Sequence, residues 1–80
     1  MFWRKVIVDY YRDDDTEFVI KIEEESEGIY LIEEHIYDLK KYPTQSDLYN
    51  KTLNDFDKEF DDDIANALDK ITKQIFKEVE

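Results

Sequence analysis

Hydrophobic and polar residues alternate with a period of two in the N-terminal third of the chain. Two short runs share this pattern and are separated by three consecutive aspartates. Their apolar members are Val6, Val8 and Tyr10 in the first run, and Phe18, Ile20 and Ile22 in the second. Alternation of this kind is typical of half-buried strands. The pattern therefore predicts a β-hairpin with residues 13–15 as its loop.

The charges flanking the two runs support one register for this hairpin. A three-residue loop pairs residues whose numbers sum to 28, which places Arg4 opposite Glu24 and Lys5 opposite Glu23. Opposite charges that face each other across a strand pair are stabilising. A slip by one residue would turn every apolar side chain to the wrong face.

A second turn is expected at residues 25–28, where Gly28 is the only glycine of the chain. It fits the positive φ required in a type I turn with a G1 bulge. Residues 29–32 then resemble a third strand. Apolar residues at 29, 32, 36 and 39 also have helical spacing and precede Pro43, so a helix within residues 29–42 remains an alternative. We expect a strand followed by a short helix.

Beyond Pro43 the hydrophobic period is helical. Thr44 and Asp47 form a variant of the capping box, and a helix over residues 49–60 would bury Tyr49, Leu53, Phe56 and Phe60. A last helix is expected to begin among Asp61, Asp62 and Asp63, because acidic residues are favourable at a helix N-terminus. Its expected buried positions are Ile64, Leu68, Ile71, Ile75 and Val79.

These elements predict an α+β fold: an N-terminal antiparallel β-hairpin or three-stranded meander packed against two or three C-terminal helices. With 80 residues, the chain is expected to form a single acidic domain spanning residues 1–80. Hydrophobic residues make up 41% of the sequence and aromatic residues 15%, which is enough for a packed core.

The charge is strongly unbalanced, with 22 acidic against 11 basic residues and a formal net charge of −11. Residues 13–34 carry ten acidic side chains against Lys21 alone. A second concentration, within residues 55–63, has six acidic side chains against Lys58. A net charge this large exceeds the magnitude of about 2–8 that solubility requires and destabilises a compact chain by self-repulsion. We infer that the excess negative charge serves to bind a partner.

Enzymatic chemistry has few candidate residues here. The chain has one histidine, two serines, one glycine and no cysteine, so a nucleophile with an oriented base or a glycine-rich phosphate loop is not expected. His35 lies next to Glu33 and Glu34 and is expected to be a surface or sheet-edge residue. We therefore predict that the protein is not an enzyme and uses no cofactor.

Asp55, Asp57 and Glu59 follow the spacing that opens a calcium-binding EF-hand loop. The sixth loop position is Phe60 where the motif needs glycine, and the twelfth is Asn66 where it needs glutamate. The match fails at both positions, so no metal site is predicted.

The carboxylates themselves are the remaining candidate recognition groups. Neighbouring carboxylates on one face lie about 6.6 Å apart on a strand and about 6 Å apart on a helix, close to the roughly 7 Å between successive phosphates of a DNA strand. The candidates on the sheet side are Asp13, Asp14, Asp15, Glu17, Glu23, Glu24, Glu25, Glu27, Glu33 and Glu34. Those on the helical side are Asp55, Asp57, Glu59, Asp61, Asp62 and Asp63. Turn formation, helix capping and protection of a sheet edge are competing explanations for some of them.

Apolar anchors could add specificity to such a charged surface. Trp3, Ile7, Tyr11 and Val19 form a stripe on the second face of the hairpin, and we take Trp3 and Tyr11 as the anchors. Burial of the stripe under helices, or in a homodimer, is the alternative.

In size, acidity and expected α+β make-up the chain resembles the small inhibitors that phages and mobile elements make, including anti-CRISPR and anti-restriction proteins. This resemblance concerns composition, and no motif carries it. We predict a non-enzymatic DNA mimic in the cytoplasm of a prokaryotic host cell, where it occupies the basic groove of a nucleic-acid-binding enzyme. It would bind neither nucleic acid nor a membrane. The alternative is an acidic protein-interaction module, such as an immunity protein, antitoxin or assembly subunit, with a basic partner.

Overall fold

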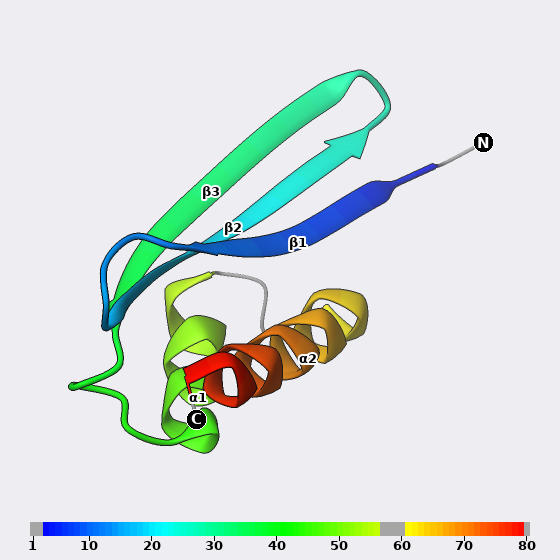
Figure 1. The fold of residues 1–80 in the computed structure, drawn as a ribbon. Coiled ribbons are helices and arrows are strands. Elements are labelled where there is room, and N and C mark those ends of the chain that lie inside the picture. The colour runs from blue at the N-terminus through cyan, green and yellow to red at the C-terminus, as the bar shows by residue number, and fades with distance from the viewer. Residues whose placement is uncertain (1–2, 57–60, 80) are drawn as a thin grey trace.

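The computed structural model describes residues 3–56 and 61–79 and confirms the α+β fold. Its elements, in chain order, are β1 (Lys5–Arg12), β2 (Glu17–Ser26), β3 (Ile29–Asp38), α1 (Gln45–Asp55) and α2 (Asp62–Val79). The strands form one antiparallel sheet in the order β1-β2-β3. Figure 1 shows both helices against one face of this sheet, with the other face left uncovered.

The predicted hairpin between β1 and β2 is present, but its register was wrong by two residues. Tyr10 lies opposite Ile20 rather than Phe18, and Lys5 lies opposite Glu25 rather than Glu23. The loop is longer than three residues because the backbone N–H groups of residues 13 and 14 both donate to the carbonyl of Glu17 (2.8 and 3.1 Å). A shift of two residues keeps each side chain on its face, so the predicted inward and outward sets survive.

The turn between β2 and β3 differs from the predicted G1 bulge. Ser26 pairs directly with Ile29, which leaves a two-residue loop. Both loop residues have positive φ, 49° at Glu27 and 83° at Gly28, as in a type I′ turn. The sequence indicated the glycine correctly and missed the second left-handed residue.

The third strand continues to Asp38, so the expected short helix after residue 32 is wrong. The strand pairs without interruption with β2, from Ile29 opposite Ser26 to Asp38 opposite Glu17. Tyr37 is buried in the core, whereas Ile36, which precedes it, is exposed. This two-residue alternation outweighed the helical spacing of the isoleucines, which remain on the surface.

The first helix begins as predicted and ends early. The Thr44 side chain accepts a hydrogen bond from the backbone N–H of Asp47 (3.1 Å), which confirms the cap. The helix ends at Asp55, not at residue 60. Its buried side is centred on Leu48 and Thr52, whereas the predicted Tyr49 and Leu53 are half-buried. Phe60 lies outside the described residues.

The second helix agrees closely with the prediction. It starts at Asp62, and it buries Ile64, Leu68, Thr72 and Ile75. Two predicted core positions differ, because Ile71 is half-buried and Val79 is exposed. Thr72 is tolerated in the core because its hydroxyl donates to the carbonyl of Leu68 (2.8 Å).

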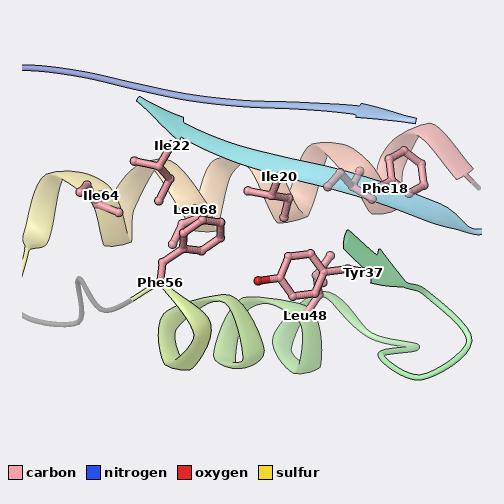
Figure 2. Close-up of a cluster of buried hydrophobic side chains, with 9 residues drawn as sticks. Phe18, Ile20, Ile22, Tyr37, Leu48, Phe56, Ile64 and Leu68 are labelled. Carbon is pink, nitrogen blue, oxygen red and sulfur yellow. The ribbon is translucent and has the colours of Figure 1, made fainter. Parts of the chain in front are cut away.

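The core lies between the helices and the inner face of the sheet, to which β2 contributes three alternate side chains, Phe18, Ile20 and Ile22 (Figure 2). The buried cluster consists of Phe18, Ile20, Ile22, Tyr37, Leu48, Phe56, Ile64, Leu68 and Ile75. Helix α2 packs beside β1 and runs in the same direction. Ion pairs join Arg4 to Asp61 at one end and Arg12 to Glu78 at the other (3.8 Å). Both segments are about 26 Å long at standard rises per residue, which explains the match.

Candidate interaction surface

Most of the net charge lies on β2, β3 and their loops. Residues 13–38 carry eleven acidic side chains against Lys21 alone, a formal charge of −10 out of −11 for the whole chain. The rest of the chain is therefore nearly neutral. The turn that joins these two strands lies well away from both helices (Figure 1). We call residues 13–38 the acidic hairpin.

The structure places eight of the ten predicted sheet-side carboxylates in two groups, with Glu33 and Glu34 between them, opposite Ile22 and Lys21 of β2. Asp13, Asp14, Asp15 and Glu17 lie around the β1–β2 loop, whereas Glu23, Glu24, Glu25 and Glu27 lie at the opposite end of β2. Glu17 and Glu25 are eight residues apart on one strand, or about 26 Å. The run of acidic residues in the sequence is therefore not one patch in space.

The loop group has a structural role in addition to its charge. The Asp14 carboxylate accepts a hydrogen bond from the backbone N–H of Asp15 (2.6 Å), and the backbone of Asp14 accepts one from Glu17 (3.2 Å). Aspartates favour such turns because their short side chains bond to nearby backbone N–H groups. Turn formation accounts for part of this group, as the competing explanation proposed.

Arg4 brings one residue of each predicted cluster together. Its Nε donates to Glu24 Oε2 (3.0 Å), and its Nη2 bonds to Asp61 Oδ2. Asp61 also caps α2, because its Oδ1 accepts from the backbone N–H groups of Asp63 (3.1 Å) and Ile64 (3.3 Å). Partial burial raises the pKa of Asp61, but the hydrogen bonds from Arg4 and the backbone outweigh it, so the pKa lies below its usual value. Glu24 and Asp61 thus stabilise the fold.

Several other candidate carboxylates are paired with nearby groups. Glu23 accepts from Lys21 Nζ (2.9 Å) and from the Tyr30 hydroxyl (2.7 Å), and these two hydrogen bonds lower the pKa of Glu23. Glu33 contacts His35 Nε2 (3.2 Å), and Asp55 pairs with Lys51 (3.0 Å). Glu23 and Asp55, which are paired with lysines, are therefore less available to an external cation than the sequence suggested.

The remaining candidates have no ion pair with any residue in the described ranges. They are Asp13, Asp14, Asp15, Glu17, Glu25, Glu27, Glu34, Asp62 and Asp63. Seven of these nine belong to the acidic hairpin. Asp57 and Glu59, also predicted as site residues, lie outside the described residues.

The uncovered face of the sheet carries apolar and charged rows in alternation. One row across the three strands is Tyr11, Val19 and Ile36, and the next is Asp9, Lys21 and Glu34. The third contains Ile7, Glu23 and Ile32, and the fourth Lys5, Glu25 and Tyr30. The predicted anchors Trp3 and Tyr11 are 47% and 50% exposed, so the helices do not bury them.

Sequence reasoning missed the most exposed apolar residues as site candidates. Ile29, Tyr30, Leu31, Ile32 and Ile36 of β3 are each between 53% and 60% exposed. A run of four successive apolar residues was the available signal, because a strand normally buries only every second residue. The expectation of a helix beginning soon after residue 32 concealed it.

The described residues offer little for small ligands on this face. The hollow beside Tyr30 and Glu25 has a volume of about 70 Å³, against at least about 300 Å³ for a typical ligand pocket. No group of three potential metal ligands occurs among residues 3–56 and 61–79. In the same ranges, neither helix is both long and apolar enough to cross a membrane. No protein-family model, curated protein or solved structure matches the chain.

Proposed function

We propose that the protein is a non-enzymatic inhibitor that imitates a nucleic-acid backbone and occupies the basic groove of a nucleic-acid-binding enzyme. Examples of such enzymes are CRISPR effectors and restriction enzymes. The protein would act in the cytoplasm of a prokaryotic host cell and bind the enzyme, not its nucleic acid.

The linear density of charge is the observation that carries this proposal. The molecule is 44 Å long and has a net charge of −11, or one negative charge for about every 4 Å. One strand of DNA carries a charge about every 3.4 Å of helix axis, and the duplex one about every 1.7 Å. The protein therefore approaches the charge density of a single nucleic-acid strand.

The positions of the unpaired carboxylates support the same proposal. The two ends of the acidic hairpin are about 26 Å apart, a distance that spans roughly eight nucleotides at about 3.4 Å each. Asp13 and Asp15 lie at one end and Glu25 and Glu27 at the other. A groove lined with lysine and arginine along its length could contact both ends at once.

The exposed apolar residues on the uncovered face of the sheet favour a second candidate function. A phosphate backbone has no counterpart to Tyr11, Ile32 and Ile36, whereas protein interfaces often contain such residues at their centre. This candidate is an acidic interaction module that binds a basic partner without blocking that partner's access to nucleic acid. Such a module would use these apolar residues as its main contact.

Capture from a prokaryotic lysate separates the two functions. The immobilised protein is washed with increasing salt and then with duplex DNA or RNA, and the eluates are identified by mass spectrometry. A mimic releases a nucleic-acid enzyme on addition of nucleic acid, because both compete for one groove. A partner that stays bound at high salt and is not released by nucleic acid would support the interaction module and contradict mimicry.

A matched pair of variants then tests the acidic hairpin itself. Glu25→Gln removes a charge from the hairpin, and Asp47→Asn removes one from α1. Neither carboxylate has an ion pair in the described part of the chain. We expect only Glu25→Gln to weaken capture, most clearly at low salt. Equal loss in both variants would mean that net charge alone governs binding.

A further inference from the structure

Residues 29–32, the first part of the outer edge of β3, lack the features that usually protect an edge strand. The strand pairs only with β2 among the described strands, and its ladder runs without a bulge. Natural sheets protect such edges with lysine, proline, bulges or a covering element. Residues 29–32 contain neither lysine nor proline, and the side chains on both faces are more than half exposed. This segment can therefore pair with another strand.

The structure also shows which backbone groups face outward. The N–H of Leu39 donates to the carbonyl of Thr16 (2.8 Å), which extends the β2–β3 ladder by one pair. Hydrogen-bonded pairs alternate along an antiparallel ladder, so the odd-numbered residues of β3 bond to β2. Tyr30, Ile32 and Glu34 accordingly turn their N–H and C=O groups toward the open edge.

We propose that this edge binds an extended segment of a partner protein by β-strand addition. The segment would place apolar side chains beside residues 29–32 and basic side chains beside Glu33 and Glu34. Backbone hydrogen bonds supply affinity in this mode, and the alternating side chains supply specificity. The mode operates whether or not the partner also binds nucleic acid, so it goes beyond the proposed function.

Charge favours a basic segment over a second copy of the chain. Two copies paired through β3 would bring together two hairpins that each carry a formal charge of −10. Charges closer than the Debye length of about 8 Å at physiological salt repel without effective screening. A basic segment gains attraction at the same positions.

A synthetic peptide tests the edge directly. The capped hexapeptide Arg-Arg-Val-Ile-Val-Thr, laid antiparallel, places its arginines opposite Glu34 and Glu33, its three apolar residues opposite residues 30–32 and its threonine opposite Ile29. Titration into the ¹⁵N-labelled protein should shift the amide signals of Tyr30, Ile32 and Glu34 more than those of the helices. A peptide with glutamates in place of both arginines should bind at least tenfold more weakly.

Backbone recognition has its own control. N-methylation of the two valines preserves every side chain and removes the N–H groups that would reach Ile32 and Tyr30. We expect this peptide to lose binding at least tenfold. Equal binding of the methylated and unmethylated peptides, or shifts confined to other surfaces, would overturn the proposal.

Two protein variants complete the test. Ile32→Pro removes an outward N–H and no ladder bond, whereas Ile32→Thr keeps that N–H and a strand-forming residue. Only the proline variant should lose the peptide, with circular dichroism confirming the fold of both. If Ile32→Pro does not fold, the methylated peptide still decides. Sedimentation would also show whether the unmodified protein dimerises. A dimer that Ile32→Pro abolishes would assign the edge to a second copy and overturn the proposal.

Discussion

Removal of Arg4 should loosen the junction between the sheet and α2. Its guanidinium bonds to Glu24 on β2 and to Asp61, which caps α2. Arg4→Met preserves most of the aliphatic stem and removes the charge and the donors. Two carboxylates that shared one cation would then face each other without it. Two carboxylates that bond to one guanidinium lie close together, so they repel each other once the guanidinium is removed. The variant should therefore be less stable than the original protein.

The size of the loss follows from the exposure of the three side chains. Arg4, Glu24 and Asp61 are 25%, 17% and 18% exposed, between a surface pair and a buried one. Exposed pairs contribute about 0–1 kcal/mol, and breaking buried ones costs about 3–5 kcal/mol. We expect a decrease in the free energy of unfolding of about 1–2 kcal/mol. For a domain of this size that lowers Tm by about 5–15 °C.

The effect should depend on pH in a specific direction. The folded pKa of Asp61 is below that of an unfolded aspartate, so its stabilisation is fully present above about pH 5. That stabilisation is lost as the pH falls through the lowered folded pKa. The stability gap between the original protein and Arg4→Met should therefore be constant from pH 7 to about pH 5 and narrow below about pH 4.

Urea unfolding followed by far-UV circular dichroism measures this gap across the pH series. Lys73→Met is the matched control, because Lys73 pairs with Asp69 (3.0 Å) where the side chains are 65% and 39% exposed. That control should change the free energy by less than about 0.5 kcal/mol. A loss for Arg4→Met no larger than the control, or one unchanged at pH 3, would refute the reasoning.

Three further substitutions test the fold by the same urea assay. Leu68→Ala opens a cavity in the closed core and should cost about 2–5 kcal/mol; a loss below 1 kcal/mol would mean that α2 does not pack as described. Thr44→Ala removes the cap of α1 and should cost about 1 kcal/mol, with no effect if another group caps the helix. Glu27→Asn places Asn-Gly in the turn, where Glu27 has positive φ, and should stabilise by a few tenths of a kcal/mol; destabilisation would exclude the type I′ turn.

Much of the fold could be predicted because one face of each element is buried. Period-two alternation placed Phe18, Ile20 and Ile22 on the inner face, and this held although the register was wrong. Register depends on loop length, which is set by backbone hydrogen bonds to Glu17 that side-chain patterns do not reveal. The end of α1 was missed because Phe56, a buried member of the predicted apolar stripe, has an extended backbone that ends the helix.

The candidate site was less predictable than the fold. The acidic residues were evident, but their grouping depends on which strands pair and where each strand ends. Arg4 unites Glu24 with Asp61, which are 37 positions apart in the sequence, while Glu17 and Glu25 on one strand lie at opposite ends of the sheet. The exposed segment of β3 was hidden because its apolar residues also fit a buried helix.

Competition with nucleic acid is the most direct test of the central claim that the acidic hairpin takes the place of a nucleic-acid backbone. Fluorescence anisotropy of a labelled DNA or RNA bound to the captured enzyme would be followed as the protein is added. We predict complete release of the nucleic acid, which weakens with salt and with Glu25→Gln but not with Asp47→Asn. A protein that binds the enzyme while the labelled nucleic acid stays bound would contradict the claim.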